Sequence, residues 1–116
     1  MSSKAIGAAD YVAIIRRGID RVQKLSSSEV ERELALLEGW RLDQGKLFRE
    51  FVFSDFSRAF GFMTASALVA ESMNHHPDWF NHYSIVKVWL DSHEVSGISM
   101  LDVDLAKKMN SLYLSE

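Results

Sequence analysis

Apolar residues recur along this chain with two different periods, and the longest stretch with a helical period lies near its centre. Between about Asp55 and Met73 an apolar side chain returns every three or four residues, which predicts a helix lying against a sheet. Ser54 or Asp55 can cap its first turn. A leucine and methionine stripe after Ser99 predicts a last helix, with Asp102 at the capping-box position.

Two shorter helical patterns come before the central helix. The segment from Asp10 to Lys24 carries an apolar stripe behind a capping aspartate, which predicts an N-terminal helix. A second helix is expected to begin where Ser28 and Glu31 form a capping-box signature. Gly39 lies just past its apolar stripe and is placed to end it.

Strand-like segments lie between the helices. The expected strands are Trp40 to Asp43, Leu47 to Phe53, Tyr83 to Asp91 and His93 to Ile98. A turn joins the first two, with Gly45 free to adopt a positive φ. Strand pairs separated by helices predict an α+β fold: a four-stranded antiparallel sheet with helices packed on one face, plus the additional N-terminal helix.

The composition excludes several classes of protein. A chain of 116 residues favours one domain, and the lack of cysteine rules out disulfides and thiolate metal sites. A formal net charge of -3 argues against direct nucleic-acid binding, which needs clustered lysine and arginine. We see no apolar run long enough to cross a membrane and no signal peptide, so we expect a cytoplasmic location.

The candidate chemistry lies in a cluster of histidines. All four histidines fall between positions 75 and 93, and His75 and His76 are followed by the only proline, Pro77. Histidine exchanges protons near neutral pH, so His75, His76 and His93 suggest proton-transfer chemistry. We interpret His82 as a surface residue. No histidine pair has the HxH or HxxxH spacing of metal ligands, so a zinc site is disfavoured.

Two carboxylates are candidates to support these histidines. Glu71 precedes His75 by four residues and shares its face if the helix continues that far, although it could simply face solvent. Pro77 biases His76 towards an extended conformation, so the two adjacent rings can flank a ligand. Asp102 could cap the last helix, hold His93 in one tautomer, or do both.

The spacing of these residues resembles that of the pterin-4a-carbinolamine dehydratases. In that family an acidic residue is followed by His-His-Pro, an aromatic residue, a histidine and an aspartate at set intervals. Here the pattern is matched by Glu71, His75-His76-Pro77, Tyr83, His93 and Asp102. Residues 55–64, Trp79-Phe80-Asn81 and Ser92-His93-Glu94 are also similar to family segments. The resemblance begins near Leu25, so residues 1–24 are interpreted as a helical extension and residues 25–116 as the family-like domain.

This resemblance implies a hydro-lyase that dehydrates 4a-hydroxytetrahydrobiopterin to quinonoid dihydrobiopterin, a step in the recycling of tetrahydrobiopterin. It implies His75, His76 and His93 as catalytic residues, with Glu71 and Asp102 in support. The expected substrate contacts are His75, His76, Pro77, Ser92, His93, Glu94 and Val95. Trp79, Phe80 and Tyr83 are either core residues or an apolar wall for the pterin ring. No cofactor or metal is expected, because the pterin is the substrate.

A different class of function stays open beside catalysis. Animal members of the family also act as dimerisation cofactors of a homeodomain transcription factor, which would add a nuclear location and use a helix surface. A third alternative is a protein that binds pterin without turning it over. The resemblance further implies a homodimer or homotetramer, formed through strand edges or through the apolar stripe of the last helix.

Overall fold

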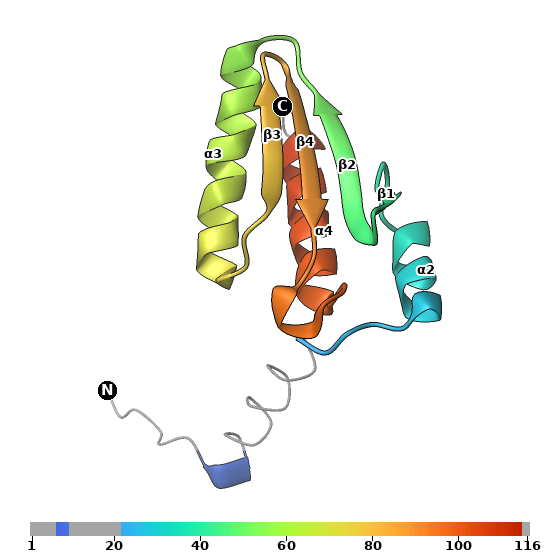
Figure 1. Ribbon diagram of the computed structural model, residues 1–116. Coiled ribbons are helices and arrows are strands. Elements are labelled where there is room, and N and C mark those ends of the chain that lie inside the picture. Colours follow the sequence, from blue (N-terminus) through green and yellow to red (C-terminus); the bar gives the residue numbers. More distant parts are fainter. Residues whose placement is uncertain (1–6, 10–21, 115–116) are drawn as a thin grey trace, which may run out of the picture.

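The computed structural model describes residues 7–9 and 22–114 of the chain. Across these residues the elements follow one another along the chain as Figure 1 shows. They are α2 (Ser27–Ala35), β1 (Arg41–Asp43), β2 (Lys46–Val52), α3 (Phe56–Met73), β3 (Asp78–His82), β4 (Ile85–Leu90), the short 3-10 helix η1 (His93–Val95) and α4 (Met100–Leu114).

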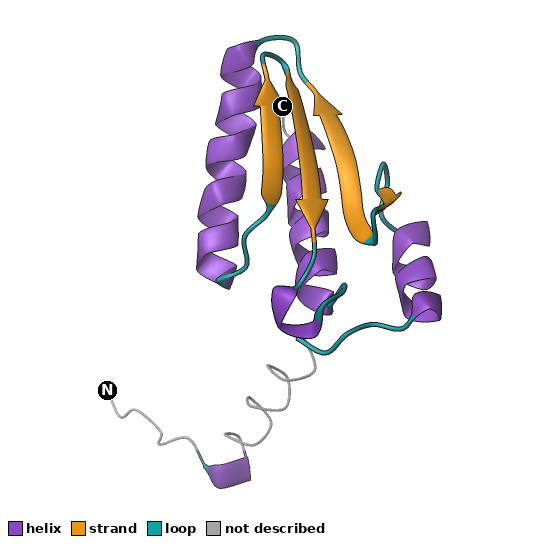
Figure 2. Ribbon diagram, in the orientation of Figure 1, coloured by secondary structure: helices purple, strands orange, loops and turns teal. Residues whose placement is uncertain are grey.

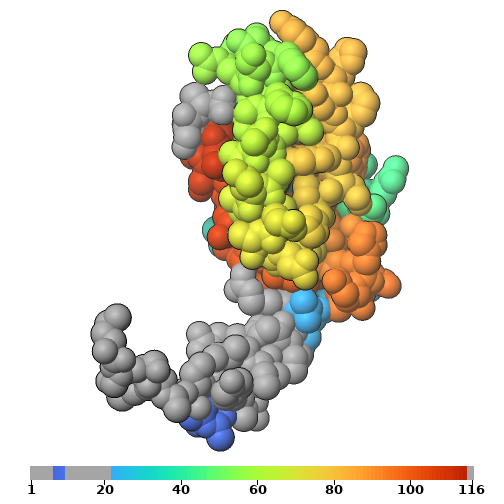
Figure 3. All heavy atoms as spheres, turned by 90° about the vertical axis from the view of Figure 1, so that its left-hand side faces the viewer, coloured from blue at the N-terminus to red at the C-terminus, as the bar shows by residue number. Residues whose placement is uncertain are grey.

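The strands of the described residues form one antiparallel sheet in the order β1-β2-β4-β3. Strand β4 therefore lies between β2 and β3, and β3 is an edge strand. The two long helices α3 and α4 pack together and lie on the same face of the sheet (Figures 2 and 3). The predicted α+β fold, a four-stranded antiparallel sheet with helices on one face, is thus confirmed.

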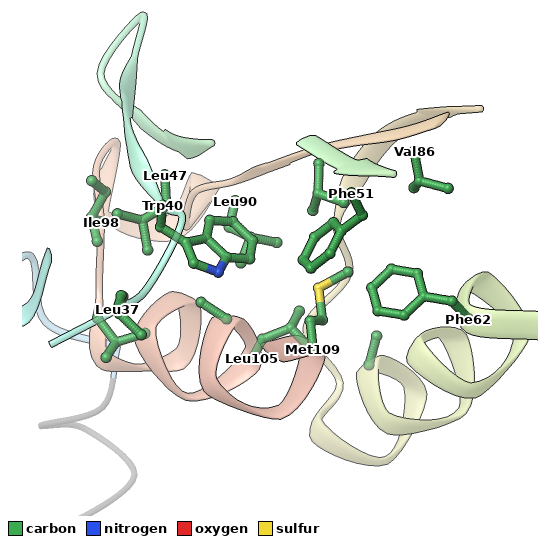
Figure 4. Close-up of a cluster of buried hydrophobic side chains, with 14 of the residues drawn as sticks. Leu37, Trp40, Leu47, Phe51, Phe62, Val86, Leu90, Ile98, Leu105 and Met109 are labelled. Atoms are coloured by element: carbon green, nitrogen blue, oxygen red, sulfur yellow. The ribbon is translucent and has the colours of Figure 1, made fainter. Parts of the chain in front are cut away.

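The core lies between this sheet and the two long helices. Alternate residues of β2 and β4 point towards the helices, and Phe51, Val86 and Leu90 are fully buried there. Met109 of α4 lies between Phe51 and Phe62 of α3 (Figure 4). Burying side chains of this size stabilises the folded chain by about 1.5–3 kcal/mol each. This packing fixes the direction of α3, α4 and β4, whose ends carry the candidate site.

Local sequence signals form as predicted at three places. Asp55 caps α3 by accepting a hydrogen bond from the amide of Arg58. Gln44 and Gly45 both have positive φ, 53° and 77°, in the tight turn between β1 and β2. Ser99 precedes α4, and its amide donates to the side chain of Asp102 as the capping-box pattern requires.

The predicted capping box of α2 is wrong by two residues. The sequence pattern fits both Ser28 with Glu31 and Ser26 with Glu29, and the structure uses the earlier pair. The Leu25 amide is bonded to the carbonyl of Ile98, so the chain is already fixed one residue before Ser26. The helix starts directly after that anchor.

The predicted fourth strand, His93 to Ile98, is also wrong. Those residues form η1 and a left-handed turn at Ser96, joined by one isolated bridge between Ser92 and Gly97. The missing strand is instead β3, Asp78–His82, which turns into β4 through Tyr83, a non-glycine residue at φ 53°. The Asn81 side chain donates to the carbonyls of Tyr83 and Ile85, which holds this turn closed.

The predicted N-terminal helix, Asp10 to Lys24, falls on residues 10–21 outside the described part, while residues 22–24 form a turn and loop. Among the described residues, none of the helices has both the length and the apolar character needed to cross a membrane.

Candidate functional site

The end of α3 points the two adjacent histidines in different directions. Asn74 adopts the left-handed conformation, φ 50°, and the amide of His75 bonds back to the carbonyl of Ala70. This pattern is a Schellman-type helix end. It turns His75 inward, with 6% of the residue exposed, and leaves 57% of the His76 side chain exposed. The predicted divergence of the two rings is therefore present.

The carboxylate of Asp102 is the buried centre of the site. Its Oδ1 accepts the Nε2 proton of His75 at 2.5 Å. Its Oδ2 accepts from the hydroxyl of Ser92 at 2.8 Å and from the amide of Ser99 at 2.9 Å. Because the Ser92 hydroxyl donates to Asp102, the hydroxyl of Ser99 donates to Ser92 Oγ at 2.7 Å. Both oxygens of the buried carboxylate are thus satisfied.

This contact changes the charge state of His75. The hydrogen bond to Asp102 raises the pKa of His75, since it favours the imidazolium form. Burial acts in the opposite direction, and the negative charges of Asp102, Glu94 and Asp91 again raise the pKa. The site therefore combines a buried histidine, whose protonated form Asp102 favours, with two exposed imidazole rings.

The third histidine stands on the loop that follows β4. The amide of Ser92 donates to the carbonyl of Gly97 at 2.7 Å, which closes residues 92–97 into a tight loop. His93 lies at the exposed side of this loop, with 82% of its side chain accessible. Its Nδ1 is 4.0 Å from Oδ2 of Asp91. Because Ser92 is bonded to Asp102, the loop and His75 are held by the same carboxylate.

These residues surround a hollow of about 200 Å³. It is lined by Asn74, His75, His76, Pro77, Asp78, Asp91, His93 and Glu94. It lies where α3 and β4 end and α4 begins, at one end of the molecule (Figure 1). Three larger hollows lie elsewhere on the described surface, and no histidine lines any of those three. The chemistry of its walls therefore makes the smaller hollow the candidate site.

Two pairings expected from the sequence are wrong. Glu71 lies 3.0 Å from Nε2 of His76, not beside His75, because the left-handed turn at Asn74 moves His75 off the helical track. Asp102 holds His75 rather than His93, although it does cap α4 as predicted. Spacing along the chain could not reveal either pairing, since both depend on how the chain leaves α3.

The other expected contacts divide between the hollow and the interior. Pro77 and Glu94 line the hollow together with the three histidines. Ser92 is fully buried and bonded to Asp102, so its side chain has a supporting position and does not reach the hollow's surface. Val95 is half-buried, and its amide donates to the carbonyl of Ser92. The substrate contacts themselves stay predictions.

The aromatic residues near the motif do not line the hollow. Trp79 is half-buried against the core, whereas Phe80 and Tyr83 are exposed. The hollow's walls instead include Asp78 and Asp91, which the sequence reasoning did not select. Asp91 lies two residues before His93, at the end of an expected strand. This position is the one sequence feature that could have indicated its place in the site.

Three of the wall residues could also supply ligand atoms to a cation. One atom each from Asp78, Asp91 and His93 lies within 4.8 Å of the others. Spacing between histidines does not indicate such a mixed set of one imidazole and two carboxylates. All three offer ordinary ligand atoms for zinc, and two of them are exposed.

The chain is similar in sequence and structure to proteins of one known family. Residues 23–112 match the family described as pterin 4 alpha carbinolamine dehydratase. A protein of Solibacter usitatus is 48% identical over 89 residues, covering 77% of this chain and 94% of its own. A protein of a Chelativorans species is 50% identical over 91 residues, covering 77% of this chain and 93% of its own. Both carry provisional names as pterin-4-alpha-carbinolamine dehydratases.

A solved structure has the same fold. The crystal structure of a transcriptional coactivator/pterin dehydratase from Brucella melitensis superposes with a TM-score of 0.76 at 44% sequence identity. The match covers 78% of this chain and 99% of the Brucella chain. At this identity the likeness extends beyond the general architecture to the family.

The link between His75 and Asp102 predicts a pH-dependent stability. Since the pKa of His75 is raised in the folded chain, its stabilising effect is fully present below the ordinary value of 6.5. The effect is lost as the pH rises through the folded-state pKa. Replacing Asp102 with Asn should therefore lower the free energy of unfolding by about 3 kcal/mol at pH 6, and by less at pH 9.

Urea unfolding of the wild type and Asp102→Asn between pH 6 and 9 measures this difference. Glu31→Gln, which removes an exposed carboxylate from α2, serves as the control for a change in net charge. A stability difference that stays constant across this pH range would show that His75 is not held as a cation by Asp102.

Proposed function

The chain belongs to the pterin 4 alpha carbinolamine dehydratase family, and from this premise we propose that it dehydrates 4a-hydroxytetrahydrobiopterin to quinonoid dihydrobiopterin. The observation that supports this most strongly is the meeting of His75, His76 and His93 around one hollow. They come from two segments 17 residues apart, the end of α3 and the loop after β4. Proton transfer in both directions at one small ligand needs such a set.

The reaction requires one proton to be delivered and another to be removed. The C4a–O bond breaks, and the departing oxygen takes a proton to leave as water. A ring nitrogen loses its proton as the new double bond forms, so the overall change is loss of one water molecule. Hydroxide is a poor leaving group, which is why a positioned acid accelerates the first step.

We assign the three histidines by their surroundings. His75 is buried and its bond to Asp102 favours the imidazolium form, so we assign it as a fixed positive charge beside the leaving oxygen. His76 is exposed next to Glu71, and in this proposal it delivers the proton to the departing hydroxyl group. His93 faces the hollow from the opposite segment and accepts the proton from the ring nitrogen.

The relative from Brucella melitensis also favours a second candidate function. That protein is described both as a transcriptional coactivator and as a pterin dehydratase. We therefore propose, as a second function of this chain, that it also binds a transcription factor. Docking to a dimeric homeodomain protein would use an exposed surface and not the histidines. A variant that has lost turnover and still binds such a partner would separate the two functions.

Self-association forms part of the proposal, through a strand edge as the sequence suggested but not through the apolar stripe of the last helix. Leu105 and Met109 of α4 are fully buried within the chain, so their stripe is unavailable to a second copy. The exposed candidates are Phe60 and Leu68 on α3, whose outer face is turned to the viewer in Figure 3, and the edge strand β3. Large exposed apolar side chains and open strand edges both favour association.

Replacement of His76 with Ala should lower the turnover of synthetic 4a-hydroxytetrahydrobiopterin by about a hundredfold to ten-thousandfold. The thermal unfolding midpoint should stay unchanged, because most of this side chain is exposed. His82→Ala is the matched control, since His82 is exposed at the end of β3 and does not line the hollow. Equal losses in both variants, or a wild type without turnover, would contradict the proposed function.

Exhaustive chelation should leave the turnover number unchanged, since we propose that protein side chains alone carry the protons. Added zinc should slow the reaction, because it would bind Asp78, Asp91 and His93. The measurement is turnover before and after treatment with a chelator, followed by titration with zinc. Activity that disappears on chelation and returns with zinc would assign the reaction to a metal.

Sedimentation equilibrium of the full-length chain at micromolar concentration should give at least twice the monomer mass of 13.2 kDa, with the tetramer as the favoured species. Introducing a charge at Leu68 should lower that mass without unfolding the chain, because the side chain is exposed. A clean monomer mass for the wild type would reject the proposed assembly.

A further inference from the structure

The side chain of Asp91 has a position that the proposed roles of the three histidines leave unused. Its carboxylate lies 4.0 Å from Nδ1 of His93 and faces the same hollow. Only 16% of the Asp91 side chain is exposed, against 82% for His93. The His93 ring is therefore exposed to solvent, whereas the Asp91 carboxylate next to it is largely buried.

Asp91 is held firmly by its neighbours in sequence. Leu90, on one side, is fully buried and is paired with Leu47 of β2. Ser92, on the other side, is buried and bonded to Asp102 and Gly97. The backbone of Asp91 is therefore fixed from both sides, whereas the ring of His93 has no such restraint.

The other carboxylates near His93 are poorer partners. Asp78 belongs to the same cluster, but its side chain is 58% exposed and lies 3.7 Å from the ammonium group of Lys46. Its charge is therefore partly balanced and more strongly screened by water. Glu94 is exposed next to His93 in the short helix η1. Asp91 is the sheltered carboxylate directed at Nδ1.

We propose that Asp91 is a positioning residue that accepts the Nδ1 proton of His93 and so presents the unprotonated Nε2 to the hollow. A carboxylate that binds one ring nitrogen fixes the tautomer, which leaves the other nitrogen free as a base. This role rests on the proposed function, in which His93 accepts the proton of the pterin ring nitrogen. Because the His93 side chain is exposed, a small rotation of its ring closes the 4.0 Å separation to a hydrogen bond without any substrate.

The direct test is the tautomer of His93 in the substrate-free chain. Nitrogen-15 spectra of the imidazole at a pH where the ring is neutral should show the proton mainly on Nδ1 in the wild type. Asp91→Asn should shift the population towards the Nε2-protonated form. Asp78→Asn should leave the His93 tautomer as it is, because its carboxylate is exposed and balanced by Lys46.

Turnover gives the second readout. Asp91→Asn should reduce kcat by about tenfold while KM changes by less than about twofold, since the residue acts through His93 rather than on the substrate. Glu50→Gln, on the exposed part of β2, is the control for loss of one negative charge and should leave kcat unchanged.

The outcomes separate this proposal from the proposed function. An unchanged tautomer in Asp91→Asn would overturn the positioning role whatever the activity. A changed tautomer with an unchanged kcat would also overturn it, because the contact would then have no part in the reaction. A wild type without turnover would reject the proposed function, while the spectra would still decide whether Asp91 holds His93.

Discussion

The buried carboxylate of Asp102 is the constraint on which the site depends. A charge with no exposure to water is costly unless each oxygen is hydrogen-bonded or paired. Here His75, Ser92 and the amide of Ser99 satisfy both oxygens. These partners belong to three segments: the end of α3, the loop after β4 and the start of α4. One side chain therefore fixes how the elements meet, and with it the outline of the hollow.

The same constraint gives the histidines different properties. His75 is drawn into the interior and its pKa is raised by Asp102, whereas His76 and His93 remain exposed around the hollow. A site with one buried histidine whose protonated form is favoured, and with two accessible imidazole rings, is suited to moving protons to and from a small polar ligand. The sheet and α4, whose packed core includes Phe51 and Met109, hold the segments that carry these side chains.

Features that depend on a few neighbouring residues could be predicted from the sequence. Features that depend on how distant segments pack together could not. The cap at Asp55, the turn at Gly45 and the capping role of Asp102 each follow from a few neighbouring residues. The turn at Tyr83 could not be predicted, because nothing in that residue type signals a positive φ. Without that turn, the local pattern gives no sign that residues 78–82 form a strand paired with β4.

The candidate residues were found by their spacing, but their partners were not. The left-handed conformation of Asn74 exchanges the partners of the adjacent histidines, so Glu71 meets His76 and Asp102 meets His75. The sheltered position of Asp91 likewise depends on β4 being an inner strand of the sheet. Such pairings follow from tertiary packing, so spacing along the chain can indicate the residues but not their partners.

Asp102 holds the buried His75 ring and favours its protonated form. Nitrogen-15 spectra of the His75 ring, recorded across a pH titration of the wild type, test this claim most directly. We expect a midpoint above the ordinary value of 6.5, with both ring nitrogens protonated below that midpoint. A midpoint at or below 6.5 would show that Asp102 does not favour the protonated ring.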